Sequence, residues 1–261
     1  MKIIRSLAIL LLIAGIQGCA TYGRISGIPS EGQKSVFKDG RKTLISIKQN
    51  SVAVAPDTET VTSGQRGDFV IAVNNGTSQD ILFSTEDVTA SANTNGQFTS
   101  LKVLSYDELI AEEKNRKAWA AVAAALQGVG DSMNAANAGY SKTYGTYSGS
   151  AYSNYGKSVS GYGSYSSTTY NYTAAQAARN TPQANSEARF ARLDAESREN
   201  LKNLSSTILK KETIFPGAWH GGIVKVDLPE VVEQPQEIKL VVNVAGEHHE
   251  FKFTQEKVAG K

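Results

Sequence analysis

Residues 238–253 read IKLVVNVAGEHHEFKF, and this stretch decides the fold. Its apolar residues recur at every second position on both sides of a turn at Gly246. That period is typical of a β-strand with one buried face, whereas a helix repeats every three or four residues. The stretch therefore predicts two antiparallel strands in a hairpin. The alternating positions are Ile238, Leu240, Val242 and Val244 before the turn, and Phe251 and Phe253 after it.

The same alternation runs through residues 43–104, where we expect several more short strands. Two Asn-Gly pairs, Asn75-Gly76 and Asn95-Gly96, interrupt it. Asn-Gly accommodates the positive φ angles of a tight hairpin turn, so we place a hairpin at each pair. The alternative for either pair is a loop that contains Asn-Gly without a hairpin. A further strand is expected at residues 222–229.

Two β-rich segments, residues 43–104 and 210–255, are 62 and 46 residues long, 108 in all. That total is close to the roughly 100 residues of an immunoglobulin-like sandwich. Either segment alone would leave a sheet with one apolar face in water, so we expect one discontinuous antiparallel β-sandwich. The predicted fold class is α+β, with the sandwich interrupted by the residues between the two segments.

Residues 105–209 are expected to form an inserted helical hairpin. Ser105-Tyr106-Asp107-Glu108 is a capping box, in which Ser and Glu satisfy backbone N–H groups at a helix start. The second helix is expected to begin near Thr181-Pro182, because Thr can cap a helix and Pro suits its first turn. The first helix carries an apolar stripe, which we expect to pack on the second helix or in a larger bundle. Its members are Trp119, Val122, Leu126, Val129 and Met133.

The segment between the predicted helices, residues 139–172, is built from Tyr, Gly and Ser. It has too few aliphatic residues to offset about 1–2 kcal/mol of ordering entropy per residue, so we expect a disordered tip. Tyrosine-rich segments also make adaptable binding surfaces, and the alternative is a passive spacer. Trp119 is a further interaction candidate, or else a residue of helix packing. The candidate tyrosines, from three near-copies of one motif, are Tyr144, Tyr147, Tyr152, Tyr155, Tyr162 and Tyr165.

The N-terminus has the features of a secretory signal peptide, which we place at residues 1–18. Lys2 and Arg5 precede an uncharged run over residues 7–16, which is too short for a helix that spans a bilayer. Gly18 and then Cys19 follow this run, and Cys19 is the only cysteine of the chain.

This arrangement resembles the lipobox of bacterial lipoproteins. The resemblance implies cleavage between Gly18 and Cys19 and acylation of Cys19, which becomes the mature N-terminus. Ala20 in place of Asp implies sorting to the outer membrane, where the lipid anchor holds the protein on the periplasmic or the surface face. The alternative is that Cys19 is an ordinary small residue of the signal. Residues 19–42 are expected to be a flexible tether between lipid and body.

A second resemblance covers about fifteen residues after the predicted insertion. Ile214-Phe215-Pro216-Gly217, followed by the run from Gly222 to Asp227, resembles a corner of the extracytoplasmic Ig-like modules of bacterial lipoproteins. The resemblance implies an Ig-like sandwich. Such modules carry no catalytic residues that could be transferred to this chain.

The charge of the chain is balanced. Without the signal peptide it has 25 Lys and Arg residues, the 27 of the whole chain less Lys2 and Arg5, against 25 Asp and Glu residues. Nucleic acid is therefore not an expected partner, because binding it needs clustered positive charge. The sequence has no nucleophile elbow, P-loop or His-Glu-x-x-His motif, so we predict neither an enzyme nor a cofactor.

The three histidines are the candidates for metal ligands or acid–base groups. His248 and His249 are adjacent, so in a regular strand they point to opposite faces, and we expect a solvated turn instead of a shared ion. His220 follows Trp219 in a Gly-rich turn. We predict no metal site, and the alternative is a small-ligand or metal site at Trp219 and His220.

Taken together, these features predict a non-catalytic lipoprotein of the cell envelope. It would act as a structural or interaction module that presents its helical arm and tyrosine-rich loop to a protein partner or to its own copies. One alternative is a chaperone-like accessory protein of a secretion or appendage system, whose sheet edges receive client strands. Another is a small-ligand or metal binder.

Overall fold

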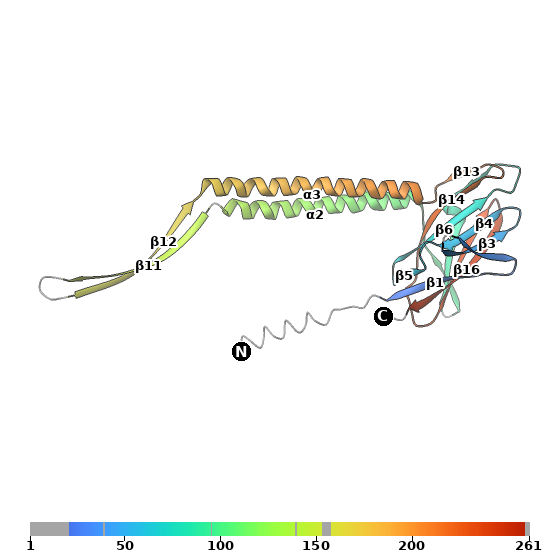
Figure 1. Cartoon of the computed structure of the whole chain (residues 1–261), viewed down its shortest axis with the longest axis horizontal. Coiled ribbons are helices and arrows are strands. Elements are labelled where there is room, and N and C mark those ends of the chain that lie inside the picture. The colour runs from blue at the N-terminus through green and yellow to red at the C-terminus, as the bar shows by residue number, and fades with distance from the viewer. Residues whose placement is uncertain (1–20, 39, 95, 139, 153–157, 259–261) are drawn as a thin grey trace. The chain divides into compact units, whose positions relative to one another are not determined.

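A computed structural model of the chain describes residues 21–258, apart from residues 39, 95, 139 and 153–157 (Figure 1). The chain divides into two compact units. Unit 1 comprises Met1–Ile110 and Asn203–Lys261, and unit 2 comprises Ala111–Lys202. The fold is α+β, as the sequence predicts, and its sheets are antiparallel. The predicted signal peptide and lipid site, residues 1–19, lie outside the described residues.

Unit 1 contains two six-stranded sheets, and each draws strands from both predicted β segments. Sheet A has the order β5 (Thr60–Thr62), β1 (Tyr22–Ile28), β16 (Glu247–Val258), β15 (Gln236–Val244), β8 (Val88–Thr94) and β9 (Gln97–Leu101). Sheet B has the order β10 (Val103–Leu104), β14 (Trp219–Asp227), β6 (Arg66–Asn74), β4 (Ser51–Pro56), β3 (Arg41–Ile47) and β2 (Gln33–Lys38). A short extra sheet pairs β7 (Ile81–Phe83) with β13 (Glu212–Ile214), and a 3-10 turn (Thr85–Asp87) precedes β8.

The apolar faces of sheets A and B pack against each other and share one core. Phe69 of β6 and Phe253 of β16 meet there, with ring centres 5.1 Å apart. Burial of one such side chain is worth about 1.5–3 kcal/mol, so this core is the main source of stability of unit 1. The alternating residues of the final hairpin point into it, which confirms the predicted strand period: Ile238, Leu240, Val242, Val244, Phe251 and Phe253.

The predicted flexible tether over residues 19–42 is wrong for residues 22–28 and 33–38, which form β1 and β2, and for residues 41 and 42, which begin β3. β1 lies inside sheet A, between β5 and β16, and its inward positions are Gly23, Ile25 and Gly27. Two of the three are glycines because neighbouring side chains fill the space: a Cβ on Gly27 would lie 3.1 Å from the side chain of Leu44. The sequence of β1 therefore lacks the alternation of apolar residues from which a strand is predicted.

One of the two predicted Asn-Gly hairpins is confirmed. β8 and β9 pair across the turn that contains Gly96, whose φ is +86°. The hairpin at Asn75-Gly76 is wrong, because the next strand, β7, pairs with β13 instead of β6. The buried Asn75 amide donates hydrogen bonds to the carbonyls of Gln79 and Ile214, over 2.7 and 2.8 Å. These two hydrogen bonds tie the loop between β6 and β7 to Ile214 of β13.

The first helix, α2 (Tyr106–Asn137), begins at the predicted capping box. The Ser105 N–H donates to Oε2 of Glu108 over 2.9 Å, and the Glu108 N–H donates to Oγ of Ser105 over 3.2 Å. Leu109 in its first turns packs with Leu104 and Ile208 in a second, smaller cluster. This cluster joins the two ends of the insertion.

The second helix, α3 (Tyr172–Thr207), begins well before the predicted start near Thr181, which is wrong. Asn171 caps it instead, since its Oδ1 accepts the N–H of Ala174 over 3.0 Å. The alanine-rich first turns have a high helix propensity, and Pro182 is accommodated inside the helix.

The Tyr/Gly/Ser segment forms two paired strands, β11 (Tyr140–Tyr152) and β12 (Ser158–Tyr170). The expected disorder is therefore wrong for these residues. Each residue of β11 has a partner in β12, and the rings of Tyr140 and Tyr170 lie 4.8 Å apart. Tyr and Thr favour strands, and cross-strand pairs of this kind each contribute about 0.2–1 kcal/mol. The expectation of disorder counted aliphatic burial alone and left these pairings out.

Two isoleucines of β1 test whether this strand is an integral part of the sheet. Ile25 is 1% exposed, whereas Ile28 is 46% exposed. We expect Ile25→Ala to lower the free energy of unfolding by roughly 2–4 kcal/mol, because it leaves a cavity in the core. Ile28→Ala is the control and should lower it by less than about 1 kcal/mol. Urea unfolding measures both, and equally small losses would show that β1 is no part of the core.

Candidate functional site

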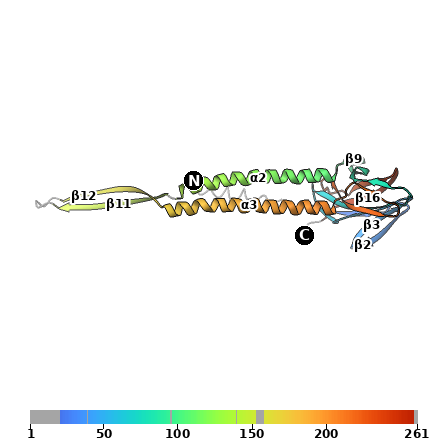
Figure 2. The ribbon, with the colours of Figure 1, turned by 90° about the horizontal axis from the view of Figure 1, so that it is seen from above.

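Helices α2 and α3 run side by side and antiparallel in unit 2 (Figures 1 and 2). The buried side chains that the structure describes at their contact are small or polar, and Trp119, Val122 and Leu126 of the predicted apolar stripe are exposed instead. The buried side chains are Glu113 and Ala124 of α2, and Ala175 and Ser197 of α3. Because these residues bury little apolar area, the pair depends on charged groups as well.

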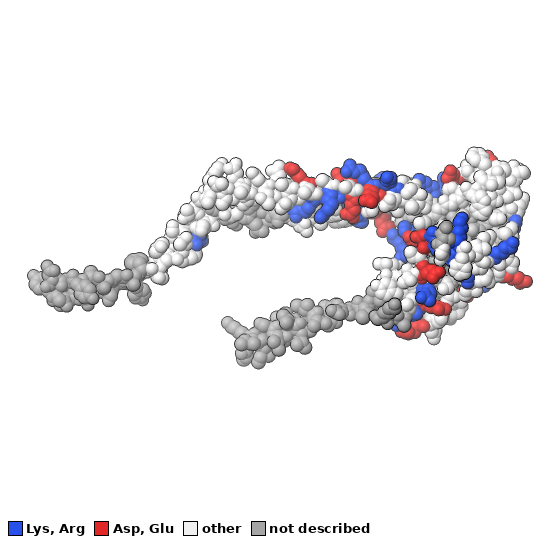
Figure 3. Space-filling model, in the orientation of Figure 1, with Lys and Arg blue, Asp and Glu red and all other residues white. Residues whose placement is uncertain are grey.

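Ion pairs set the register between the two helices. Arg116 binds Glu113 of its own helix over 2.8 Å and Glu196 of α3 over 3.1 Å. Lys117 binds Asp194 of α3 over 2.6 Å. The hydrogen bonds from Arg116 lower the pKa of Glu113, so this nearly buried carboxylate stays charged at neutral pH. Figure 3 shows the resulting mixture of basic and acidic side chains on the visible face of the pair.

The described part of the apolar stripe, Trp119, Val122 and Leu126, lies on the opposite side of α2 from α3. Trp119, Val122 and Leu126 are 75%, 50% and 68% exposed. With 3.6 residues per turn, they project away from the buried Glu113 and Ala124. The expectation that the stripe packs on the second helix is therefore wrong for these three residues. Trp119 is left as an exposed candidate for an interaction with another molecule.

The structure brings some of the candidate tyrosines together. Tyr144 and Tyr165 are exposed and line one hollow of about 440 Å³ on the paired strands. The ring of Tyr165 lies on Gly145, where a Cβ would come within 2.4 Å of it. The others are placed by backbone alone or lie outside the description: Tyr147 and Tyr152 are in β11, Tyr162 is in β12, and Tyr155 is not described.

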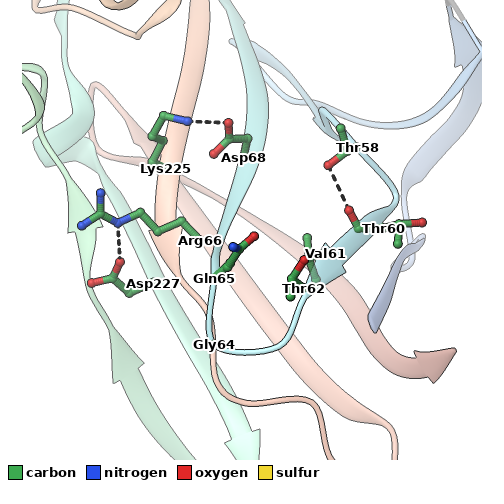
Figure 4. Close-up of a pocket in the computed structure, with 10 residues that line it drawn as sticks. All are labelled: Thr58, Thr60, Val61, Thr62, Gly64, Gln65, Arg66, Asp68, Lys225 and Asp227. Atoms are coloured by element: carbon green, nitrogen blue, oxygen red, sulfur yellow. Dashed lines mark hydrogen bonds and ion pairs between the residues drawn. The ribbon is translucent and has the colours of Figure 1, made fainter. Parts of the chain in front are cut away.

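Unit 1 carries a polar hollow of about 700 Å³ that the sequence did not indicate. Figure 4 shows Arg66 joined to Asp227, and Lys225 joined to Asp68, beside the threonines of β5 and the loop before it. Its two basic and two acidic side chains balance each other. The lining therefore suits a neutral or zwitterionic polar ligand better than a strongly charged one. Its ten lining residues include no histidine or cysteine.

A buried polar cluster lies near the β3–β4 and β15–β16 turns of unit 1. His249 is fully buried, with Nδ1 2.9 Å from Oγ of Ser46 and Nε2 3.6 Å from Oε2 of Glu247. Glu247 in turn accepts the backbone N–H groups of Gln49 and Asn50 over 3.1 and 2.9 Å. Ser, His and Glu also occur in hydrolase triads, but here Ser46 and His249 are shut between the sheets, where a substrate does not reach. The cluster is structural.

The pKa values of this cluster follow from burial and hydrogen bonding. Burial lowers the pKa of His249; the Glu247 carboxylate opposes this shift and the Lys48 charge adds to it. Burial acts to raise the pKa of Glu247, but hydrogen bonds from Asn50 and Gln49 outweigh it and the pKa is lowered. At neutral pH the cluster therefore combines a neutral imidazole with a carboxylate.

The histidines do not gather into a metal site. His248 is exposed and His249 is buried, so the expected opposite faces are observed, but the expected solvated turn is wrong for His249. His220 has Nδ1 3.1 Å from Oε2 of Glu212 and Nε2 3.2 Å from the carbonyl of Lys210, beside the exposed Trp219. Over the described part of the chain, no three His, Cys, Asp or Glu side chains are grouped as a metal would require.

Comparisons with known proteins add no family to this geometry. The chain matches no protein-family profile, and neither the curated proteins nor the solved structures include a match. Neither described helix is apolar enough along its length to cross a bilayer.

The sequence held one overlooked signal for the buried cluster. Ser46 follows Leu44 by two residues, and His249 precedes Phe251 by two, so both stand at inward positions of their strands. A polar residue at an inward position predicts a buried hydrogen bond. The polar hollow had no such signal, because it brings β14 beside β5 and β6, which lie much earlier in the chain.

The lowered pKa of the buried His249 should make the stability of unit 1 depend on pH. Its folded pKa lies below the ordinary value of 6.5, so its contribution is complete above pH 6.5 and is lost as the pH falls through the folded pKa. Between pH 7.5 and 5.5 we expect the free energy of unfolding to fall by up to about 1.5 kcal/mol. Urea unfolding should show this fall in the His248→Gln control but not in His249→Gln. An equal fall in both variants would contradict the assignment to His249.

Proposed function

We propose that this protein is a non-catalytic lipoprotein of the cell envelope, anchored in the outer membrane through an acyl group on Cys19. The lipobox resemblance at Gly18 and Cys19 supports the anchor. The two packed antiparallel sheets support an Ig-like sandwich as the body, interrupted by a helical insertion. The role we propose is that of a structural and interaction module. The exposed apolar stripe of α2 is the observation that carries it.

The partner we propose for this stripe is the same stripe of a second copy. Trp119, Val122 and Leu126 have the three- and four-residue spacing of a coiled-coil seam, in which identical stripes interlock about a twofold axis. Residues 118–130 contain no charged side chain, so two copies approach without repulsion between like charges. Alanines on both sides of the stripe allow close approach of the helices.

Two groups of ionisable side chains in the described chain are consistent with a role without catalysis. In the polar hollow, Asp68 and Asp227 are each paired with a cation. In the core, His249 and Ser46 are closed off from solvent. Neither arrangement offers an accessible base beside a nucleophile, which acyl-transfer chemistry needs.

Strand β2 favours a second candidate function, that of an accessory protein which receives client strands. It is the last strand of sheet B, so its outer edge has no partner strand in the described chain. Val36 and Phe37 on this edge are exposed. An open edge with apolar side chains can bind an extended peptide through main-chain hydrogen bonds.

A double variant tests self-association through the stripe. We expect Trp119→Ser/Leu126→Ser to weaken dimerisation at least tenfold, about 1.4 kcal/mol or more, because it removes two large apolar side chains from the seam. Ala188→Ser/Ala195→Ser makes two changes with the same seven-residue spacing at exposed alanines of α3, away from the stripe, and is the control, which should dimerise like the original. Sedimentation equilibrium of the acylated chain in density-matched detergent measures both. A monomer in all three samples would refute the proposal.

Cys19 and Ala20 test the anchor and its destination separately. Cys19→Ala should abolish incorporation of labelled palmitate and release the protein from membranes, because the acyl group has no sulfur to occupy. Ala20→Asp keeps the sulfur, so it should remain acylated but fractionate with the inner membrane. Palmitate labelling and density-gradient fractionation give both results. Labelling that persists in Cys19→Ala would exclude Cys19 as the lipid site.

A further inference from the structure

The described chain begins at an end of sheet A that is firmly held. The carbonyl of Thr21 accepts the N–H of Ser63 over 2.8 Å. The next residue, Tyr22, pairs with β5 on one side and β16 on the other. The Ser63 hydroxyl also accepts the N–H of Val231 over 2.9 Å, so a second loop closes over this point. Thr21 is thus part of the folded body.

The distance from Cys19 to this body is limited by covalent geometry. Cys19 precedes Thr21 by two residues, which span at most about 7 Å even when fully extended. The headgroup region of each bilayer leaflet is about 5–8 Å thick. Acyl chains on Cys19 enter the hydrocarbon, so the sulfur stays at the membrane surface. A body that begins at Thr21 has no room to stand away from the bilayer.

We propose that the Thr21 end of unit 1 rests directly on the bilayer headgroups. We call this end the basal surface and define it by Tyr22, the turn at residues 63–65, and Val232. The inference rests on the proposed acylation of Cys19. It adds an orientation to the proposed function, because it states which end of the sheets faces lipid.

The side chains of the basal surface suit the headgroup layer. Tyr22 and Val232 are 45% and 44% exposed. A tyrosine places its ring among lipid carbons and its hydroxyl in water, which is why tyrosine is enriched at membrane interfaces. The loop before Val232 is fixed, since Val231 packs where a Cβ on Gly23 would come within 2.7 Å of it.

The charges near the basal surface indicate the kind of lipid that it meets. The polar hollow shares Gly64 and Gln65 with this surface, and its charged groups form two ion pairs (Figure 4). Lys257 at the end of β16 is paired with Glu233. Balanced charges of this kind match zwitterionic headgroups, whereas binding to acidic lipids relies on unpaired lysines and arginines.

The opposite end of unit 1 supplies a control position. There the β3–β4 turn meets the β15–β16 turn, since the Gln49 N–H donates to Oε1 of Glu247 over 3.1 Å. β16 runs from Glu247 to Val258, 12 residues that span about 35 Å toward the basal surface. Gln49 is therefore far from any bilayer that contacts Tyr22.

Fluorescence quenching on vesicles tests the orientation. The acylated full-length chain is reconstituted in phosphatidylcholine vesicles that carry spin-labelled headgroups. Acylation removes the only thiol, so a cysteine introduced as Gln65→Cys or Gln49→Cys takes a fluorophore at one place. We expect at least fivefold stronger quenching at residue 65 than at residue 49. A flexible Gly/Ser insert of about 12 residues between Ala20 and Thr21 should remove most of that difference.

The outcomes separate this inference from the proposed function. Equally weak quenching at both positions, in protein that mass spectrometry shows to be acylated and that floats with the vesicles, overturns the basal surface and leaves the anchor intact. Quenching at residue 65 that the insert does not change overturns the two-residue limit as its cause. Protein that carries no acyl group and does not float refutes the lipid anchor, and the inference with it.

Discussion

The contact between sheets A and B is the constraint on which the rest of this structure depends. Neither sheet can be completed by one part of the chain: β14 of sheet B comes from the second β segment, and β5, β8 and β9 of sheet A come from the first. Folding therefore closes a loop as long as the whole insertion. The entropy of closure grows only slowly with loop length, and the cluster of Leu104, Leu109 and Ile208 joins the ends.

Unit 2 depends on a different kind of interaction. Its helices meet through Glu113, Ser197 and alanines, and Arg116 and Lys117 bind acidic residues of α3. Charged contacts of this kind set register but contribute little stability, about 0–1 kcal/mol each at the surface. They also leave the apolar stripe of α2 facing outward. Because α2 turns its polar and alanine-rich side toward α3, its apolar stripe faces outward.

The sequence predicts the parts of this fold that local rules control. Alternation identified the final hairpin, and the capping box at Ser105 located the start of α2. Alternation does not reveal β1, because two of its inward positions are glycines. The side chains of Leu44 and Val231 fill the space beside these glycines. Of the two partners expected for the stripe of α2, the second helix is wrong for Trp119, Val122 and Leu126, because alanines make several faces of the helix alike. Trp119 was identified as a candidate, whereas the polar hollow depends on strand contacts that no local pattern reveals.

The strand at residues 22–28 also changes how the proposed self-association should be understood. If Cys19 is acylated as proposed, two residues confine the body to the membrane surface, whereas a long tether would let it explore a thick layer above the membrane. Confinement raises the effective concentration of one copy around another, so a stripe with modest affinity in solution can pair extensively on a membrane. The helices suit this arrangement, because α2 and α3, of 32 and 36 residues, form a stiff pair about 50 Å long. A stiff element loses less entropy on binding than a flexible one, so the proposed contact is pre-organised.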